Sequence, residues 1–146
     1  TLAMLQAGWS VHATDLTPTA FDHLAKNIPS KFSKQLTTQC CSFEDVKWKK
    51  VQWVNASYCL PFCEKKVFPN VWQNVVHSLE PGSVFTGHFF GPRDTWKSLM
   101  LLGKMKVKQL FKGFYFPLFS ETEEDKDPAV GPTKHWHLFE VVAVKK

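Results

Sequence analysis

Polar residues stand at the ends of three predicted strands, and their types suit the parts of a nucleoside ligand. Asp15 ends the first strand, Ser42-Phe43-Glu44 ends the second, and Asn55-Ala56-Ser57 ends the third. The carboxyl ends of parallel strands meet at one edge of a sheet, where a carboxylate binds ribose hydroxyls. An apolar residue beside a polar one suits adenine, and a small polar turn suits the third portion of the ligand. Each position alone also fits a structural role, since Asp before a helix is an ordinary cap. The recurrence of such residues at three strand ends favours an adenosine compound as the ligand.

The elements that must position these residues alternate between strands and helices. One predicted helix begins at Thr17-Pro18, with Thr17 as its N-cap, and is stopped by Pro29. Its buried stripe would be Phe21, Leu24, Ala25 and Ile28. A second helix over 68–79 has the clearest apolar face in the chain. The predicted strands cover Ser10–Asp15, Leu36–Phe43, Val51–Ala56 and Ser83–Phe90. Strands separated by helices or long crossovers indicate an α/β fold with a doubly wound, mostly parallel sheet.

The two ends of the chain depart from this alternation. Residues 1–8 are typical of the last turns of a helix, with Gly8 as its C-terminal cap. Residues 97–112 predict another helix, with Leu101 and Met105, and either Leu102 or Val107, facing inward. Strands over 114–121 and 135–144, joined by an acidic loop, predict an antiparallel hairpin. We expect one domain over residues 1–146.

Composition argues against several functional classes. The net charge of +5 is carried almost wholly by Lys, and Arg93 is the only arginine, whereas nucleic-acid readers usually use Arg for bidentate contacts. The Lys residues are spread along the chain, so a solvated surface is the better interpretation and we do not expect a nucleic-acid partner. No apolar segment is long enough for a membrane helix, and no signal peptide is recognisable. We therefore expect a cytoplasmic protein with no membrane partner.

The four cysteines predict neither a disulfide nor a metal site. Cys40 and Cys41 are adjacent in a predicted strand, so their side chains point to opposite faces and cannot chelate one ion. Cys59 and Cys63 flank Leu60-Pro61-Phe62 and lack a second pair at metal-ligand spacing. We expect reduced thiols and no bound metal.

Several motifs together resemble one enzyme family over nearly the whole chain. The narrowest are Asn55-Ala56-Ser57, within the run 54–63, and Lys134-His135-Trp136-His137, whereas Leu79-Glu80-Pro81-Gly82 before a strand is more widespread. The other matching segments are 8–18, 43–45 and 90–96, and the match at the end of the chain covers 134–139. On these residues the chain resembles the class I S-adenosylmethionine-dependent methyltransferases, particularly the small bacterial group related to tellurite-resistance and thiopurine-type enzymes. The resemblance implies a Rossmann-like fold that closes with an antiparallel hairpin, and S-adenosylmethionine as cofactor.

The resemblance also implies roles for the residues at the strand ends. Asp15 would hold the ribose hydroxyls, with Leu16 packing beside the adenine. Phe43 and Glu44, together with Ser42, would bracket the adenine ring and its amino group. The methionine part of the cofactor would contact Asn55, Ala56 and Ser57.

The chemistry implied is in-line attack by a small-molecule acceptor on the sulfonium methyl, which needs positioning more than a proton relay. Candidates at the mouth of the site, where the acceptor would bind, are Tyr58, Phe62, Trp96, His135 and His137. The two histidines alternate along a predicted strand and so share a face, which suits a base, a metal clamp or a substrate contact. The alternative is that they are plain hairpin residues packed beside Trp136. Tyr58, His135 and His137 are the candidates for a catalytic role.

One departure from the family pattern concerns the start of the chain. The family begins with a central strand and a Gly-rich loop before the helix that opens this chain, and Gly82, Gly87 and Gly91 do not replace that loop. We favour a truncated chain, with a gap between the first and third predicted strands. The alternative is a catalytically inactive remnant that serves as a binding or interaction module; a Lys-rich nucleic-acid binder is a further alternative. A sheet edge exposed at the gap would favour self-association.

Overall fold

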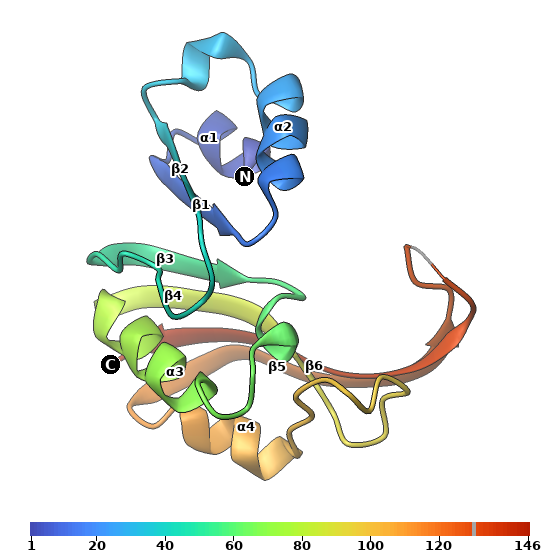
Figure 1. The fold of residues 1–146 in the computed structure, drawn as a ribbon. Helices are drawn as coiled ribbons and strands as arrows, with labels where there is room; N and C mark the ends of the chain where they lie inside the picture. The colour runs from blue at the N-terminus through green and yellow to red at the C-terminus, as the bar shows by residue number, and fades with distance from the viewer. Residues whose placement is uncertain (130) are drawn as a thin grey trace. The chain divides into compact units, whose positions relative to one another are not determined.

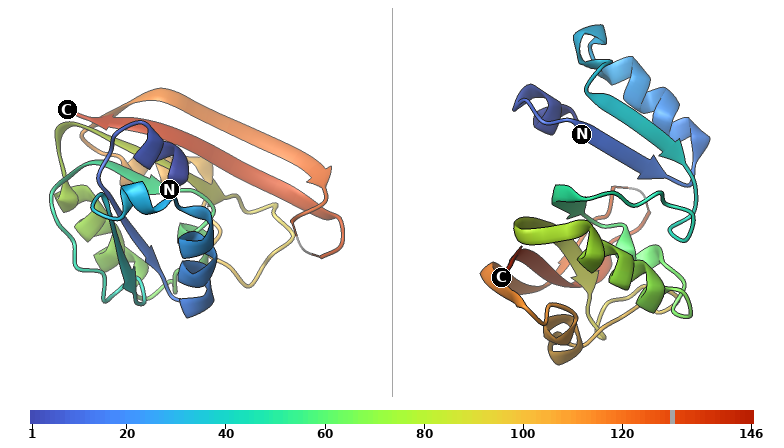
Figure 2. Two further views of the ribbon diagram at one scale, coloured as in Figure 1. Left: turned by 90° about the horizontal axis from the view of Figure 1, so that it is seen from above. Right: turned by 90° about the vertical axis from the view of Figure 1, so that its left-hand side faces the viewer.

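The structure is a computed structural model that describes residues 1–129 and 131–146. The chain divides into two compact units, residues 1–47 and residues 48–146. Figures 1 and 2 show the elements of each unit, which we describe separately.

The first unit is a small parallel α/β arrangement. Strands β1 (Val11–Asp15) and β2 (Leu36–Cys40) pair in parallel, with Asp15 opposite Cys40. Helix α2 (Pro18–Asn27) connects them through a short 3-10 turn at Ser30–Phe32. Helix α1 (Leu2–Gln6) precedes β1, and Gly8 follows it at φ +88°, as predicted for a cap that needs the left-handed region.

The prediction that the helix after Thr17 buries its apolar stripe is wrong, because α2 has no buried residue. Within this unit the helix packs on a sheet of only two strands, which is too narrow to cover its apolar face completely. The predicted side-chain cap by Thr17 is also absent. Instead, Oδ1 of Asp15 accepts a hydrogen bond of 2.8 Å from the Thr17 backbone N–H, which closes a turn at the end of β1.

The second unit contains a four-stranded mixed sheet in the order β3-β4-β6-β5. Strand β3 (Val51–Ala56) pairs in parallel with β4 (Leu79–Phe90). Strand β4 pairs antiparallel with β6 (Lys134–Lys145), which forms the hairpin with β5 (Phe114–Lys126). The remaining elements are a 3-10 turn at Leu60–Phe62 and the helices α3 (Phe68–Ser78) and α4 (Lys104–Leu110).

Aromatic rings form the core of this unit. Trp72 of α3 contacts Phe85 and Phe89 of β4 and Phe111 after α4, with ring centroids 5.3, 5.9 and 4.9 Å away. These rings meet at steep angles, as edge-to-face aromatic packing favours. The predicted apolar face of the helix over 68–79 is confirmed, since Phe68, Val71, Trp72 and Val75 are buried.

The helix predicted over 97–112 is wrong over its first half. Backbone N–H groups of this segment donate to carbonyl groups outside it instead. Met100 donates to the Pro61 carbonyl at 2.9 Å, and Leu102 donates to the Phe90 carbonyl at 2.8 Å. Helix α4 starts only at Lys104. Met105, predicted to face inward, is 68 % exposed, whereas Val107, predicted as an alternative to Leu102 on the inward face, is buried.

The α/β class, the parallel pairing of β1 with β2 and of β3 with β4, and the antiparallel hairpin are confirmed. Strand β4 begins earlier than predicted, and β5 continues to Lys126, into the acidic segment 123–128 that we expected to be a loop.

Candidate functional site

The first group of predicted site residues lies at the carboxyl ends of β1 and β2. Because these strands are parallel and in register, Asp15 and the segment after Cys40 share one edge of the small sheet. Asp15 is exposed, and among the described residues only the Thr17 N–H donates to its carboxylate, at Oδ1. The other oxygen is therefore available to accept a hydrogen bond. Leu16 is 70 % exposed beside it.

The residues predicted to contact adenine follow β2 in an irregular segment. The Ser42 hydroxyl donates to a carboxylate oxygen of Asp45 at 2.8 Å. Phe43 is half-buried, and Glu44 is exposed. Both residues belong to the same unit as Asp15.

The second group lies at the carboxyl end of β3, in the larger unit. The Asn55 side-chain oxygen accepts hydrogen bonds from Ser57 Oγ at 2.8 Å and from Thr86 Oγ1 at 3.1 Å. Ala56 is buried opposite Gly87, and a Cβ on Gly87 would lie 2.9 Å from the Ala56 carbonyl oxygen. Gly87 thus permits the close approach of β4 that fixes this end of β3.

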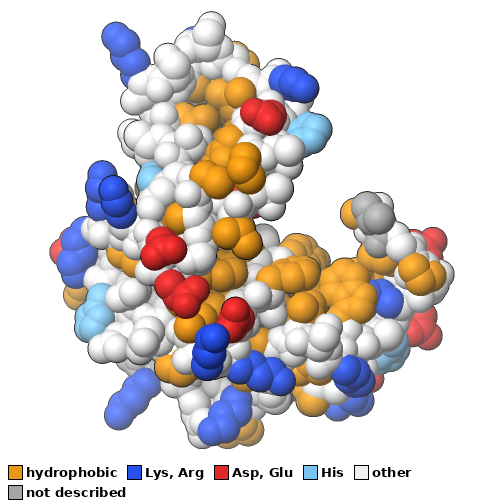
Figure 3. Space-filling view, viewed as in Figure 1, with side chains coloured by type: hydrophobic (Ala, Val, Ile, Leu, Met, Phe, Trp, Pro, Cys, Tyr) orange, Lys and Arg blue, Asp and Glu red, His pale blue; other side chains and the backbone are white. Residues whose placement is uncertain are grey.

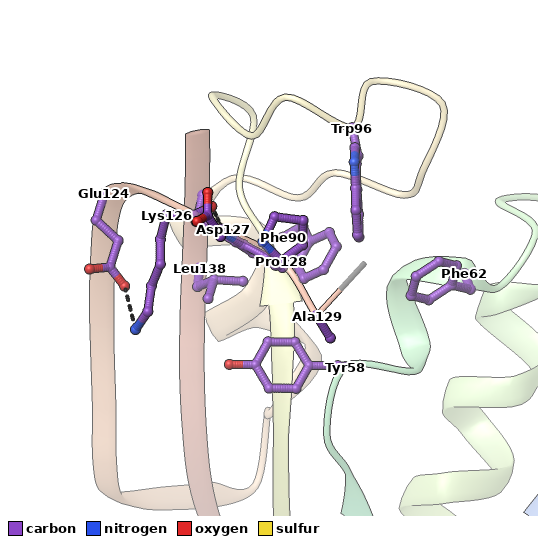
Figure 4. Close-up of a pocket in the computed structure, with 11 residues that line it drawn as sticks. Tyr58, Phe62, Phe90, Trp96, Glu124, Lys126, Asp127, Pro128, Ala129 and Leu138 are labelled. Atoms are coloured by element: carbon purple, nitrogen blue, oxygen red, sulfur yellow. Dashed lines mark hydrogen bonds and ion pairs between the residues drawn. The ribbon is translucent and has the colours of Figure 1, made fainter. Parts of the chain in front are cut away.

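A cavity of about 600 Å³ begins directly after this strand end, with Tyr58 in its wall. Tyr58 and Phe62 come from the segment after β3, and Trp96 comes from the loop after β4 (Figure 4). The rest of the lining comes from the end of β4 and from the hairpin: Phe90, Glu124, Lys126, Asp127, Pro128, Ala129, Trp136 and Leu138. Figure 3 shows hydrophobic side chains gathered at the surface beside this hairpin. The cavity suits an apolar ligand with polar groups at one rim.

Tyr58 combines several features seen at functional positions. Its φ of +54° places a non-glycine residue in the left-handed region, which is uncommon and costs energy. Its ring stacks on His88 at 4.0 Å between centroids with 14° between planes. Nδ1 of His88 is buried without a hydrogen-bond partner among the described residues, and this burial lowers the pKa of His88. The imidazole ring that stacks on Tyr58 is therefore uncharged at neutral pH.

A buried ion pair stands behind the aromatic wall. The Lys134 ammonium donates to Oδ1 of Asp94 at 2.7 Å, and the side chains are 3 % and 0 % exposed. It also lies 3.8 Å from the Trp96 ring centroid and 3.7 Å from that of Trp136, within cation–π range. Asp94 further accepts the backbone N–H groups of Trp96 and His137, at 2.9 and 3.1 Å. The pair fixes the loop that carries Trp96 against β6.

The predicted histidines do not line the cavity, because alternation along β6 places them on the opposite face from Trp136. His135 bonds to Asp125 at 2.8 Å and to Glu123 at 3.0 Å. Nε2 of His137 is hydrogen-bonded to Glu121 at 3.0 Å, and its Nδ1 accepts a hydrogen bond of 3.1 Å from the backbone N–H of Arg93. Both rings thus belong to an ionic ladder between β5 and β6.

The contacts of the ladder shift the pKa values of His135 and Glu123. The hydrogen bond with Asp125, followed by that with Glu123, raises the pKa of His135. The Arg93 guanidinium lies 2.7 and 2.8 Å from the two Glu123 oxygens, and these bonds are the main cause that lowers the Glu123 pKa to about 2.

The structure thus brings Tyr58, Phe62 and Trp96 together around one cavity and leaves His135 and His137 away from it. Sequence reasoning missed the other wall residues, Phe90, Trp136 and Leu138, and the Lys134–Asp94 pair behind them. The alternation of the run 134–138 carried a signal, since a face shared by two histidines leaves Lys134, Trp136 and Leu138 on the other.

Two further findings concern the described residues. None of the helices there is long and apolar enough to cross a membrane. Cys40 and Cys41 are free thiols, and no group of three or more His, Cys, Asp or Glu side chains in the described ranges is placed to hold a metal ion.

Sequence comparison finds no matching protein-family model and no matching curated protein. Comparison of structures finds many similar chains. TehB from Haemophilus influenzae superposes with a TM-score of 0.76 at 12 % identity, over 95 % of this chain and 51 % of TehB. This chain therefore spans about half the length of TehB.

Two further solved structures resemble the chain. A methyltransferase from Burkholderia thailandensis that acts at N1 of 1,6-didemethyltoxoflavin, solved with that compound and S-adenosylhomocysteine, has a TM-score of 0.71 at 16 % identity, over 98 % of this chain and 64 % of that one. An S-adenosylmethionine-dependent methyltransferase from Methanosarcina mazei has a TM-score of 0.73 at 14 % identity, over 99 % of this chain and 85 % of that one. The chain therefore has the fold of the class I S-adenosylmethionine-dependent methyltransferases.

Proposed function

We propose that this chain contributes to methyl transfer from S-adenosylmethionine to a small-molecule acceptor. The observation that carries the proposal is the likeness of fold to methyltransferases, one of which is solved with S-adenosylhomocysteine and its acceptor. The polar strand ends and the cavity that begins directly after Ser57 support it, because ligands of open α/β sheets bind beyond the carboxyl ends of the strands.

The residues at the strand ends fit the proposed cofactor. Asp15 is exposed and has a carboxylate oxygen that accepts no hydrogen bond from the described residues, as a group that binds ribose hydroxyls requires. We assign Leu16, Ser42, Phe43 and Glu44 to the adenine. Asn55, Ala56 and Ser57 are assigned to the methionine portion, and the exposed Asn55 and Ser57 side chains supply polar groups there.

When bound, S-adenosylmethionine supplies an electrophilic methyl group on a sulfonium. The task of the chain is to hold the acceptor in line with that methyl and to exclude water, which accounts for most of the acceleration in such a displacement. The aromatic walls around Tyr58, Phe62 and Trp96 suit both parts of that task. The reaction proposed here assigns no proton transfer to His135 or His137, whose ring nitrogens are engaged in the ladder.

Thermal unfolding in the presence of S-adenosylhomocysteine tests the proposal. A ligand that binds only the folded chain stabilises it by about 2.7 kcal/mol at a concentration of 100 times its Kd, so the melting temperature should rise with ligand concentration. Asp15→Asn keeps an oxygen for the Thr17 N–H but removes the charge, and it should reduce the shift. Asp22→Asn, an exposed substitution on α2, is the matched control and should leave the shift unchanged. A melting temperature that ligand does not move would contradict the proposal and favour a non-catalytic interaction module.

A further inference from the structure

The described lining of the cavity carries a net negative charge, although the net charge of the chain is +5. Its charged side chains are those of Glu124, Lys126 and Asp127, which are two carboxylates and one ammonium. Figure 4 shows Glu124 and Lys126 paired with each other, with 3.8 Å between the carboxylate oxygen and Nζ. Because that pair is neutral as a whole, the charge that remains in the lining is that of Asp127.

Asp127 has no cationic partner among the described residues. One oxygen of its exposed carboxylate accepts a short hydrogen bond from the hydroxyl of Thr133, which is neutral. The other oxygen accepts no hydrogen bond from the described residues. A cation in the cavity would therefore balance a charge that the chain leaves unbalanced, whereas an anion would be repelled by it.

Aromatic rings surround the space beside these charged groups. Tyr58 stands at 79° to Trp136, Trp136 at 58° to Trp96, and Trp96 at 61° to Phe62, with centroids 6.3, 5.5 and 6.2 Å apart. Rings at such angles enclose a compact group on several sides instead of offering one flat surface. Aromatic cages hold quaternary ammonium groups in this way, by the attraction of a cation to the ring faces.

An internal ammonium already contacts part of this ring set. The Lys134 Nζ lies 3.8 and 3.7 Å from the ring centroids of Trp96 and Trp136. Its charge is balanced by Asp94 at 2.7 Å, so the buried pair adds no net charge to the wall. Among the described residues no cation lies over the rings of Tyr58 and Phe62, and these two rings are available to a ligand.

From the net negative lining and the steeply angled rings we infer that the acceptor is an organic cation, whose ammonium-type group lies against Tyr58 and Phe62 with Asp127 as its counter-charge. The positive group is separate from the atom that takes the methyl, because that atom attacks with a lone pair. The inference rests on the proposed function for the word acceptor, whereas the preference for a cation depends only on the cavity of residues 48–146.

Asp127 tests the electrostatic part of the inference. Asp127→Asn removes the charge and keeps an oxygen for the Thr133 hydroxyl. Asp125→Asn is the matched control, because it makes the same change of charge two residues away, at an exposed side chain on β5 that does not line the cavity.

Phe62 tests the aromatic part. Its ring is 55 % exposed, so Phe62→Leu should remove the ring without disturbing the core. Tyr115→Leu is the control for this change, because the Tyr115 ring is 51 % exposed on β5 and does not line the cavity.

The experiment is a ligand-observed NMR titration of the full chain at pH 7.5 with three probes of nearly the same shape. Choline has a fixed positive charge, 3,3-dimethyl-1-butanol has carbon in place of the nitrogen and is neutral, and 3,3-dimethylbutanoate is negative. We expect choline to bind at least about tenfold more tightly than either of the others. Asp127→Asn and Phe62→Leu should each reduce this preference by about threefold or more, whereas the two control variants should leave it unchanged.

A choline titration at saturating S-adenosylhomocysteine separates the acceptor site from the cofactor site. We expect choline to bind in its presence, because acceptor and cofactor must be bound together for the methyl to pass between them. Competition between the two ligands would overturn the assignment of the cation to the acceptor.

The remaining outcomes are equally decisive. Choline that binds no more tightly than its neutral or negative counterpart would overturn the inference, as would a preference that Asp127→Asn or Phe62→Leu leaves intact. Absence of choline binding by a chain that binds S-adenosylhomocysteine would overturn it and leave the proposed function standing. Selective choline binding by a chain that does not bind S-adenosylhomocysteine would support the cavity preference and contradict the proposed function.

Discussion

The Lys134 ammonium and the Asp94 carboxylate form a hydrogen-bonded ion pair of 2.7 Å in which both side chains are almost fully buried. Lys134 lies at the start of β6 and Asp94 in the loop after β4, so the pair joins segments that are distant in sequence. Through it the two tryptophans that form one wall of the cavity share a single cation. The geometry of the candidate acceptor site therefore depends on a contact that lies behind it.

Removing one partner of this pair should be costly. Lys134→Met leaves the Asp94 charge buried and unpaired, and we expect a loss of about 3–5 kcal/mol in the free energy of unfolding. Lys134→Met combined with Asp94→Asn should lose less, because the remaining polar group is neutral. Lys126→Met, at the cross-strand neighbour of Lys134, is the control and should change stability by less than about 1 kcal/mol, as exposed pairs do. Urea unfolding of the three variants measures this; equal losses for Lys134→Met and Lys126→Met would contradict it.

Gly91 makes room for a buried ring. A Cβ at this position would overlap the His137 imidazole, which is 1 % exposed and held by Arg93 and Glu121. We expect Gly91→Ala to destabilise the chain by about 1–3 kcal/mol, the usual cost of overpacking. Gly103→Ser is a fitting comparison, since a Cβ there meets nothing within 4 Å and Ser is favoured before a helix. A Gly91→Ala protein as stable as the wild type would show that the ring moves freely.

His88 should make stability fall as pH is lowered. Burial lowers its pKa from the ordinary value of 6.5, against an opposing effect of Glu140. Below about pH 6.5 the unfolded chain therefore binds a proton that the folded chain does not, and the free energy of unfolding decreases until the folded pKa is reached. His88→Phe keeps a ring to stack on Tyr58 and should remove this contribution. NMR titration of His88 together with unfolding at pH 7.5 and 5.5 tests it; a His88 pKa at or above 6.5 would contradict it.

The pH dependence contributed by His135 in the hairpin ladder should have the opposite sign to that of His88. The pKa of His135 is raised from 6.5, chiefly by Asp125, so its contribution is complete below pH 6.5 and is lost as pH rises through the raised value. The Glu123 pKa is lowered from 4.5 to about 2, so its contribution is present above pH 4.5 and is lost as pH falls through that interval. The ladder is therefore strongest between these limits. Asp125→Asn should bring the pKa of His135 back toward 6.5 and leave the pKa of His88 unchanged. An NMR titration that follows both histidines measures this.

Local patterns predicted much of the fold. The alternation of strands with helices led to the parallel pairing of β1 with β2, and the apolar spacing of 68–79 led to α3 and its buried face. The helices and strands themselves are predicted from residues within a few positions of each other. The helix predicted over 97–112 failed because its first half bonds to Pro61 and Phe90, partners that no local pattern reveals.

The candidate site was predictable to a similar extent. Tyr58, Phe62 and Trp96 converge on one cavity, and the first two stand directly after a recognisable strand end. His135 and His137 were correctly placed on a common face, but which face meets the cavity depends on the pairing with β5 and on the loop around Asp94. The ion pair of Lys134 with Asp94 is equally non-local, so the sequence alone did not indicate it.

The central claim is that this fold binds the cofactor of the methyltransferases, and calorimetric titration of the folded chain with S-adenosylhomocysteine tests it most directly. We predict saturable heat with one ligand bound per chain, reduced by Asp15→Asn and unaffected by Asp22→Asn. No heat at millimolar ligand, from protein whose circular dichroism shows it to be folded, would contradict the claim.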